Sequence, residues 1–270
     1  MSFFIGSRGR IFHDAWLPDG EIDRVVVLLH GYGEHLGLYD ALARRLIADG
    51  CAVHAMDAVG HGRSDGERAV LDFDVYVDDA RQLANIATDR HPGRPVVLIG
   101  HSGGALAAYL LALRSHGIAD ALVLSGAPLR PQKWIEAALA EPEDQEDVNA
   151  DPSEVFSTHP DYVHALMHDP LTWHGGFRRE SLCAITRVWP EAAAGLAEGL
   201  PELPVLFVHG EDDQIVQVAD ARAGAAQLPD ARLVTFPGDL HDVLNEHDRG
   251  TVHDVVAGFV AEITVAPALV

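Results

Sequence analysis

Short apolar runs alternate with longer segments of helical periodicity along most of the chain. Each run is rich in Val, Leu and Ile and stops at small or polar residues; the runs are 25–29, 52–56, 96–99, 121–124 and 205–208. Continuous apolar runs of this length are typical of parallel strands that are buried on both faces. Because the carboxyl ends of such strands bind ligands in open α/β sheets, we expect these strand ends to converge on one site.

The segments between the runs predict crossover helices. Apolar residues recur at helical spacing over 39–48, 75–88 and 105–114, and a final amphipathic segment at 252–263 closes the fold. The expected fold class is therefore α/β, with a mostly parallel sheet flanked by helices.

The alternating pattern stops between residues 128 and 200. No strand-like run occurs there, and aromatic residues mix with a strongly acidic stretch at 141–151. We interpret this part as an insertion that forms a small helical cap over the carboxyl edge of the sheet, with the acidic stretch as an exposed loop. The predicted domains are a core of residues 1–127 and 201–270 and a cap of residues 128–200.

The composition is that of a folded globular protein. The 270 residues are 48% hydrophobic and 22% charged, a balance too apolar for a disordered chain. A net charge of -22, from 41 acidic and 19 basic residues, would repel the phosphate backbone of a nucleic acid. Nucleic acid is therefore not an expected partner.

No segment predicts secretion or membrane insertion. Arg8 and Arg10 interrupt the stretch where a signal peptide needs its apolar run, and no window approaches the roughly 20 apolar residues of a membrane span. Cys51 and Cys183 are far apart and belong to no paired motif, so we expect two buried free thiols. These features predict a soluble, cytoplasmic protein.

The five residues Gly100-His101-Ser102-Gly103-Gly104 match the G-x-S-x-G pattern of a nucleophile elbow. They follow a predicted strand directly and precede a predicted helix, which is the context that an elbow requires. In such a turn the glycines let strand and helix approach closely, and the serine hydroxyl projects above the sheet. The alternative, an ordinary glycine-rich turn, is disfavoured by this context. Ser102 is therefore the predicted nucleophile.

A serine hydroxyl needs a base to take its proton, and the base needs an acid to hold its tautomer. His241 lies in a loop between the strand-like segment 232–236 and the last helix, and it is the predicted base. Asp212 and Asp213 follow the run at 205–208, and from the pattern alone either aspartate suits the acid. The chain order Ser, Asp, His is the one expected for an α/β-hydrolase fold.

An oxyanion hole needs two donors aimed at one point. The backbone amide of Gly103, directly after the nucleophile, is the first predicted donor. The second is the amide of Tyr32, in the glycine-containing loop that follows the run at 25–29. The same glycines also suit a plain turn, and the two interpretations are compatible.

Four motifs together resemble the monoacylglycerol lipases of the α/β-hydrolase superfamily. They are His30-Gly-Tyr-Gly-Glu-His35, Asp57-x-x-Gly-His-Gly-x-Ser64-Asp-Gly66, Gly-His-Ser102 and His-Gly-x-x-Asp213-x-Ile-Val216, and the resemblance covers nearly the whole chain. It implies an ester hydrolase that works through an acyl-enzyme and needs no cofactor. It places Asp213 at the position of the triad acid, and Tyr32 and Gly103 at those of the oxyanion hole. Substrate contacts are expected for Glu34, His35 and His101.

The chain departs from the family pattern in the first loop. Leu36 and Leu38 replace the serine and the arginine of the family pattern, in which the arginine and the glutamate help to receive the glycerol end of the substrate. The change favours, as an alternative, a general carboxylesterase for less polar alcohols; lysophospholipids and thioesters also suit an apolar cap. A non-catalytic ligand sensor is the alternative from another class, and the complete Ser, Asp, His set argues against it.

The cap is expected to supply apolar residues either to an acyl-chain site or to its own core. They are Trp134, Phe156, Leu166, Met167, Leu171, Trp173, Phe177 and Trp189. The expected partner is a small-molecule lipid or ester, with transient contact between the cap and micelles or a membrane surface. His164 and His168 are four residues apart, but without an H-E-x-x-H pattern or a third ligand they predict no metal site.

Overall fold

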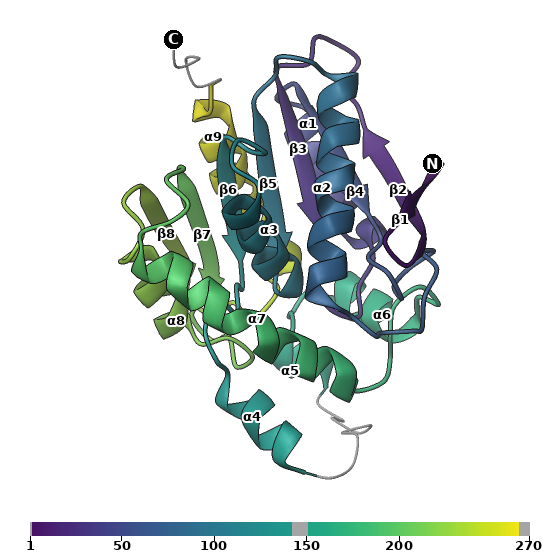
Figure 1. Ribbon diagram of the computed structural model, residues 1–270, viewed down its shortest axis with the longest axis vertical. Coiled ribbons are helices and arrows are strands. Elements are labelled where there is room, and N and C mark those ends of the chain that lie inside the picture. The colour runs from purple at the N-terminus through teal and green to yellow at the C-terminus, as the bar shows by residue number, and fades with distance from the viewer. Residues whose placement is uncertain (1, 142–150, 265–270) are drawn as a thin grey trace.

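An eight-stranded sheet forms the centre of the computed structural model, which describes residues 2–141 and 151–264 (Figure 1). The strand order is β1-β2-β4-β3-β5-β6-β7-β8, with β3 to β8 parallel and β1 and β2 antiparallel to their neighbours. The strands are β1 (Ser2–Gly6), β2 (Gly9–Trp16), β3 (Arg24–Leu29), β4 (Cys51–Met56), β5 (Val96–His101), β6 (Ala121–Ser125), β7 (Val205–Gly210) and β8 (Ala231–Phe236).

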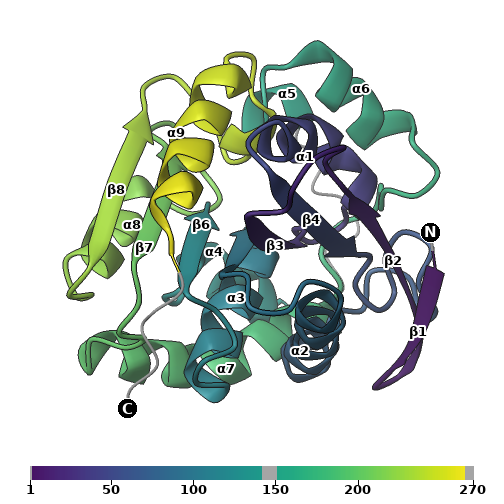
Figure 2. The ribbon, with the colours of Figure 1, turned by 90° about the horizontal axis from the view of Figure 1, so that it is seen from above.

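Helices cover both faces of this sheet, as the view from above shows (Figure 2). One face carries α1 and α9, and the other carries α2, α3 and α8. Two short 3-10 helices, η1 (Leu36–Tyr39) and η2 (Val243–Asn245), lie in loops. The flanking helices are α1 (Asp40–Ile47), α2 (Phe73–Arg90), α3 (Gly103–Arg114), α8 (Val218–Ala225) and α9 (Arg249–Glu262).

Strand β3 shows why the predicted strands are apolar throughout. Val25 and Val27 belong to the hydrophobic cluster under α2 and α3, the α2–α3 cluster, whereas Val26 and Leu28 belong to the cluster under α1 and α9. Successive side chains of a strand point to opposite faces, so a strand covered on both sides has no position that faces water. The same arrangement confirms the expected fold class.

A helical insertion between β6 and β7 covers the carboxyl ends of the parallel strands (Figure 1). Its last helix packs against α3 and joins the α2–α3 cluster through Leu182, Ile185 and Trp189, so continuous apolar packing connects the insertion to the sheet. The division into a core and a cap stays a prediction, and residues 142–150 of the acidic stretch lie outside the described residues. The insertion contains α4 (Lys133–Ala140), α5 (Pro152–Val155), α6 (Pro160–His168) and α7 (Arg179–Ala197).

The five apolar runs correspond to β3 to β7 and the strand-like segment 232–236 to β8, each within two residues of the expected bounds. The pattern does not predict the hairpin of β1 and β2 or helix α8. The β1 strand lies at the edge of the sheet, and most of its residues are at least partly exposed. An edge strand needs no continuous apolar run, so the signal used for the central strands is missing there.

Cysteine burial and helix hydropathy bear on two further expectations. Cys51 is a buried free thiol, but the free thiol of Cys183 on α7 is only partly buried, so the expectation of two buried thiols is wrong for Cys183. Within residues 2–141 and 151–264, no helix combines the length and the apolar character needed to cross a membrane.

Candidate active site

Ser102 lies on a sharp turn between β5 and α3. Its φ of 50° and ψ of -119° place a non-glycine residue in backbone space that such residues rarely adopt. Hydrogen bonds hold both sides of the turn: the Ser102 N–H donates to the Ser125 carbonyl at 2.8 Å, and the Ala105 N–H donates to the Ser102 carbonyl at 2.9 Å. A strained serine held between strand and helix is the geometry of a nucleophile elbow.

Two glycines of the motif make this turn possible. A Cβ on Gly100 would lie 2.3 Å from the Gly104 carbonyl oxygen, and a Cβ on Gly104 would lie 2.1 Å from the Leu29 carbonyl oxygen. A Cβ on Gly103, in contrast, would have its nearest contact at 3.6 Å, with Leu71. The close approach of β3, β5 and α3 therefore requires glycine at the first and last positions of the motif.

The side chains of His241 and Asp213 form a close pair near this turn. The His241 Nδ1 lies 2.7 Å from the Asp213 Oδ2, and the Asp213 Oδ1 accepts the N–H groups of Ile215 and Val216 at 2.8 and 2.9 Å. His209 Nε2 lies 3.1 Å from the same Asp213 Oδ2. The structure therefore pairs His241 with the buried Asp213, whereas the adjacent Asp212 is exposed.

The charges of this pair support each other. Burial alone would raise the pKa of Asp213, but His241 and the hydrogen bonds from His209 and His241 outweigh burial and hold the pKa well below its usual range. Burial likewise would lower the pKa of His241, and Asp213 reverses that effect, so the His241 pKa is raised. An ionised Asp213 beside His241 is the arrangement that fixes one imidazole tautomer and stabilises the imidazolium.

Ser102 and His241 both line a cavity of about 610 Å³ between the sheet and the insertion. No hydrogen bond joins the two side chains within the described residues, as is common before a substrate binds. Six of the eight apolar residues expected in the insertion line the cavity, whereas Leu171 and Trp189 do not. The six are Trp134, Phe156, Leu166, Met167, Trp173 and Phe177.

Two residues with unused backbone amides line the cavity near Ser102. Tyr32 and Gly103 both line the cavity, and within residues 2–141 and 151–264 neither backbone N–H donates a hydrogen bond. The loop that carries Tyr32 passes close to the nucleophile, since a Cβ on Gly31 would lie 3.3 Å from the Ser102 Cβ. Two unused amides next to Ser102 are what the predicted oxyanion hole requires.

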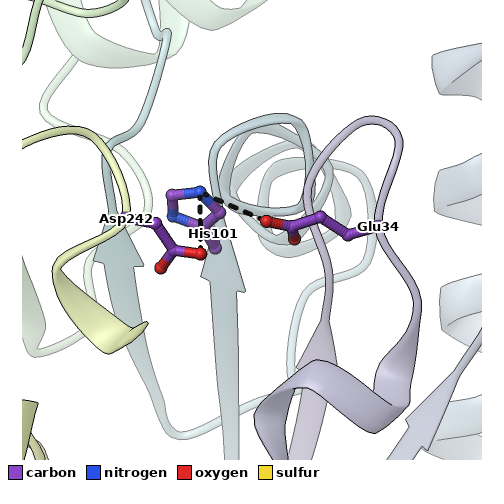
Figure 3. A group of neighbouring side chains, drawn as sticks. All are labelled: Glu34, His101 and Asp242. Carbon is purple, nitrogen blue, oxygen red and sulfur yellow. Dashed lines mark ion pairs between the residues drawn. The ribbon is translucent and has the colours of Figure 1, made fainter. Parts of the chain in front are cut away.

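A buried polar cluster borders the cavity. Glu34 and His101 line the cavity, whereas Asp242 does not line it. The side chains of Glu34 and Asp242 flank His101 on either side (Figure 3). The ligand atoms of the three residues lie within 4.8 Å of one another, a spacing that suits a metal ion. However, the hydroxyl of Tyr162 already bonds both carboxyl groups, which accounts for their approach without a metal. Neither Asp242 nor Tyr162 is predicted from the sequence, because they come from segments far from Glu34 in the chain.

Three residues singled out in the first loop lie elsewhere. His35 does not line the cavity; its Nε2 lies 3.2 Å from the Asp169 Oδ2, and its Nδ1 accepts the Gly37 N–H. The expectation that His35 contacts the substrate is therefore not supported by its position. Leu36 and Leu38 pack with the cluster under α1 and α9 and do not line the cavity either.

Comparisons with known proteins agree with this geometry. The family described as serine aminopeptidase, S33 matches residues 20–248. The monoacylglycerol lipase of Mycolicibacterium smegmatis is 35% identical, covering 95% of this chain and 95% of that protein, and the monoglyceride lipase of Homo sapiens is 31% identical, covering 91% and 85%. A solved monoglyceride lipase variant from Saccharomyces cerevisiae superposes with a TM-score of 0.83 at 18% identity, covering 98% of this chain and 96% of that chain.

A mostly parallel sheet that presents Ser102 after β5, Asp213 after β7 and His241 after β8 defines a serine hydrolase of the α/β-hydrolase fold. Together with the matched family and relatives above 30% identity over most of its length, this shows that the chain belongs to the monoacylglycerol lipase family. The enzyme is therefore a serine ester hydrolase.

Proposed function

We propose that the enzyme hydrolyses monoacylglycerols or similar fatty-acid esters through an acyl-enzyme. His241 takes the proton of Ser102 as its oxygen attacks the ester carbonyl, and Asp213 holds the imidazole in the tautomer that can accept this proton. His241 then protonates the departing alcohol. Water activated by His241 attacks the acyl-enzyme and releases the fatty acid and free Ser102.

The amides of Tyr32 and Gly103 stabilise the negative charge that develops on the carbonyl oxygen. Among the described residues neither amide has another partner, and both lie next to Ser102, so they cost no reorganisation when the charge appears. Removal of one donor of this kind typically costs about 10² to 10³ in turnover. The reaction needs no cofactor in this scheme.

The observation that carries the choice of substrate is the cavity itself. Ser102 and His241 lie on the wall of a cavity that the insertion lines mostly with apolar residues, and Glu34 and His101 line the same cavity from the sheet side. Each buried methylene of an acyl chain contributes about 0.8 kcal/mol to binding, so apolar walls favour fatty acyl groups over short ones. The similarity to monoacylglycerol lipases supports the same substrate class.

The test compares two substrates with the same acyl chain. Initial rates on a 1-monoacylglycerol and on the methyl ester of that fatty acid are measured, with Ser102→Ala as the blank. A higher kcat/KM for the glyceride supports recognition of glycerol. Equal rates, or a preference for the methyl ester, would make the enzyme a general carboxylesterase.

Labelling by a fluorophosphonate probe tests the nucleophile independently. Wild-type protein that is labelled, and Ser102→Ala protein that is not, support catalysis by Ser102. Absence of labelling in both would favour the non-catalytic sensor. Location in the cytoplasm and transient contact of the cap with micelles stay predictions.

A further inference from the structure

The hydroxyl of Tyr162 lies between two buried carboxyl groups. It is 2.6 Å from the Glu34 Oε1, and it also makes a short hydrogen bond with the Asp242 Oδ2. Asp242 is 0% exposed and Glu34 is 6% exposed. The three groups come from the loop after β3, from α6 of the insertion and from the loop that carries His241.

The number of protons in this arrangement is limited. A phenol carries one proton and can donate it to one partner only, while its oxygen can accept one hydrogen bond in return. Burial raises the pKa of Tyr162 well above its usual range, so the phenol stays protonated. If both carboxyl groups were ionised, one of the two short contacts would join oxygen atoms without a proton between them. One carboxyl group must therefore be a neutral acid that donates to Tyr162.

The other donors indicate which carboxyl group is neutral. The Glu34 Oε2 already accepts the Gly31 N–H at 2.7 Å and the Tyr39 hydroxyl at 2.5 Å, which favours the ionised form of Glu34. Asp242 accepts one further bond, from the Asn245 Nδ2 at 3.1 Å, and its Oδ1 is buried without a partner. The arrangement that fits these counts is a neutral Asp242 donating to Tyr162, which donates to an ionised Glu34.

Apart from His241, no cation among the described residues balances a second negative charge there. His101 Nε2 lies 4.0 Å from the Glu34 Oε1 and 3.8 Å from the Asp242 Oδ2 (Figure 3), but burial lowers the His101 pKa to about 4 although Glu34 opposes the shift. Among the described residues, no Lys or Arg makes an ion pair with either carboxyl group. Burial and the charge of Asp242 raise the pKa of Glu34. Burial raises the pKa of Asp242 as well, although its hydrogen-bond partners and the charge of His241 oppose the shift.

We propose that Glu34 and Asp242 hold one proton between them through Tyr162, and that this pair positions the catalytic His241 and limits the negative charge beside it. The proposal rests on the proposed role of His241. Asp242 is the next residue after His241, and the Glu34 loop carries the Tyr32 amide, so the link joins the loops of the base and of the oxyanion hole. Tyr162 adds α6 of the insertion to the same link.

The retained proton matters for the base. Asp213 already raises the His241 pKa, and two further ionised carboxylates would raise it more. A histidine that stays protonated at neutral pH cannot accept the proton of Ser102. The other titratable groups facing the pair are Tyr39 and Tyr76, which stay neutral because their pKa values are raised well above the usual range by burial.

Two variants distinguish one negative charge on the Glu34–Asp242 pair from two. They are Asp242→Asn and the double variant Glu34→Gln/Asp242→Asn. In Asp242→Asn the Asn amide still donates to the Tyr162 hydroxyl. In the double variant the Gln amide donates to the Tyr162 hydroxyl, and this hydroxyl donates to the Asn oxygen. Both networks therefore stay hydrogen-bonded. The acid-limb midpoint of kcat/KM against pH, which reports His241 in the free enzyme, is the readout. We expect it unmoved in Asp242→Asn and lower by about one pH unit in the double variant.

Asp161→Asn is the matched control, since Asp161 is exposed on the same helix as Tyr162. Like the double variant, it removes one formal negative charge. It should leave the midpoint in place. A midpoint that already falls in Asp242→Asn would show that both carboxyl groups are ionised and would overturn the proposal. A midpoint unmoved in the double variant would overturn the action of the pair on His241.

Infrared spectroscopy detects the proton retained on the Glu34–Asp242 pair and requires no measurement of enzyme turnover. The difference spectrum of wild type minus Asp242→Asn at pH 7 should contain the C=O stretch of a carboxylic acid, and its absence overturns the shared proton. If Asp242→Asn does not fold, Tyr162→Phe takes its place: loss of the bridging hydroxyl should shift the acid band, and an unchanged band counts against the link. Because Ser102 labelling by the fluorophosphonate probe is scored separately, a missing band leaves the hydrolase assignment intact.

Discussion

Two adjacent aspartates differ entirely in their surroundings. Asp213 is buried and its carboxylate accepts two backbone N–H groups besides its contact with His241, whereas the Asp212 side chain is exposed to water. Each hydrogen bond to the ionised form stabilises it, so burial does not neutralise Asp213. The chemistry of this position comes from its partners and not from the residue type, which the two neighbours share.

Asp213→Asn should lower kcat/KM by about 10³- to 10⁴-fold, because an amide no longer fixes the tautomer of His241 that accepts the Ser102 proton. Asp212→Asn is the matched control and should change kcat/KM by less than about twofold, as expected for an exposed side chain away from such contacts. Steady-state kinetics with one ester and thermal melts of both variants provide the measurement. Equal losses in the two variants would contradict the assignment of Asp213.

At the scale of elements, the approach of β3, β5 and α3 decides the geometry of the turn that carries Ser102. Gly104 brings the first turn of α3 against the end of β3, and Gly100 brings β5 against the same turn. The unusual backbone of Ser102 persists because hydrogen bonds on both sides of the turn hold it.

Gly104→Ala should destabilise the protein by about 1–3 kcal/mol or more, because its Cβ would lie 2.1 Å from a backbone oxygen that cannot move freely. Gly103→Ala is the control in the same motif, and its free energy of unfolding should stay within about 0.5 kcal/mol of wild type because the nearest atom is at ordinary contact distance. Urea unfolding of both variants tests the contrast. Similar stabilities would show that the backbone relaxes around Gly104.

A second link between elements joins the insertion to the oxyanion loop. The Tyr32 hydroxyl accepts the Arg178 N–H at 2.9 Å, and the Trp173 N–H donates to the Gly33 carbonyl at 2.8 Å. The Tyr32 ring also stacks on Phe177, with ring centroids 4.8 Å apart. The segment before α7 therefore holds the loop that carries one predicted oxyanion donor.

Tyr32→Phe should lower kcat by about tenfold through a small displacement of the backbone amide. Tyr109→Phe removes a comparable bond, since the Tyr109 hydroxyl donates to the Leu200 carbonyl at 2.7 Å away from the cavity. Both variants should lose about 1 kcal/mol of stability, but only Tyr32→Phe should lose activity. Unchanged kcat in Tyr32→Phe would mean that the insertion does not position the donor.

At the scale of the whole molecule, acidic residues exceed basic ones by enough to give a net charge of -22. Some of the acidic groups are buried, and their neighbours add to the cost of ionisation. Burial, together with Asp248 and Glu246, raises the pKa of Asp239 to about 7. Because its ordinary value is 3.8, Asp239 prefers the neutral form in the folded protein, and folding loses stability as the pH rises from about 4 through about 7.

Asp239→Asn should therefore stabilise the protein by about 1–2 kcal/mol at pH 8, a figure reduced for solvent screening, and leave its stability nearly unchanged at pH 4. Asp230→Asn is the control, because Asp230 is exposed and its substitution should have no pH-dependent effect. Thermal melts across this pH range measure the difference. A gain at pH 4 equal to that at pH 8 would show that the effect is not ionisation.

Local pattern determined much of this protein. The strands β3 to β8, the elbow at Ser102 and the loop of His241 are readable from the sequence because each depends on residues that are close in the chain: apolar runs, flanking glycines and turn residues. The resemblance to a known family added Asp213 at the triad position, and the structure pairs it with His241.

Only the tertiary structure decided which distant side chains meet. Tyr162 bonds Glu34, which is 128 residues away in the chain, and Asp242, which is 80 residues away. Nothing in the local sequence around any of the three indicates these contacts. Leu36, Leu38 and His35 lie in the expected loop but outside the cavity. The reason is physical: the packing of the insertion on the sheet sets which faces of each loop line the cavity, and that packing depends on the whole chain.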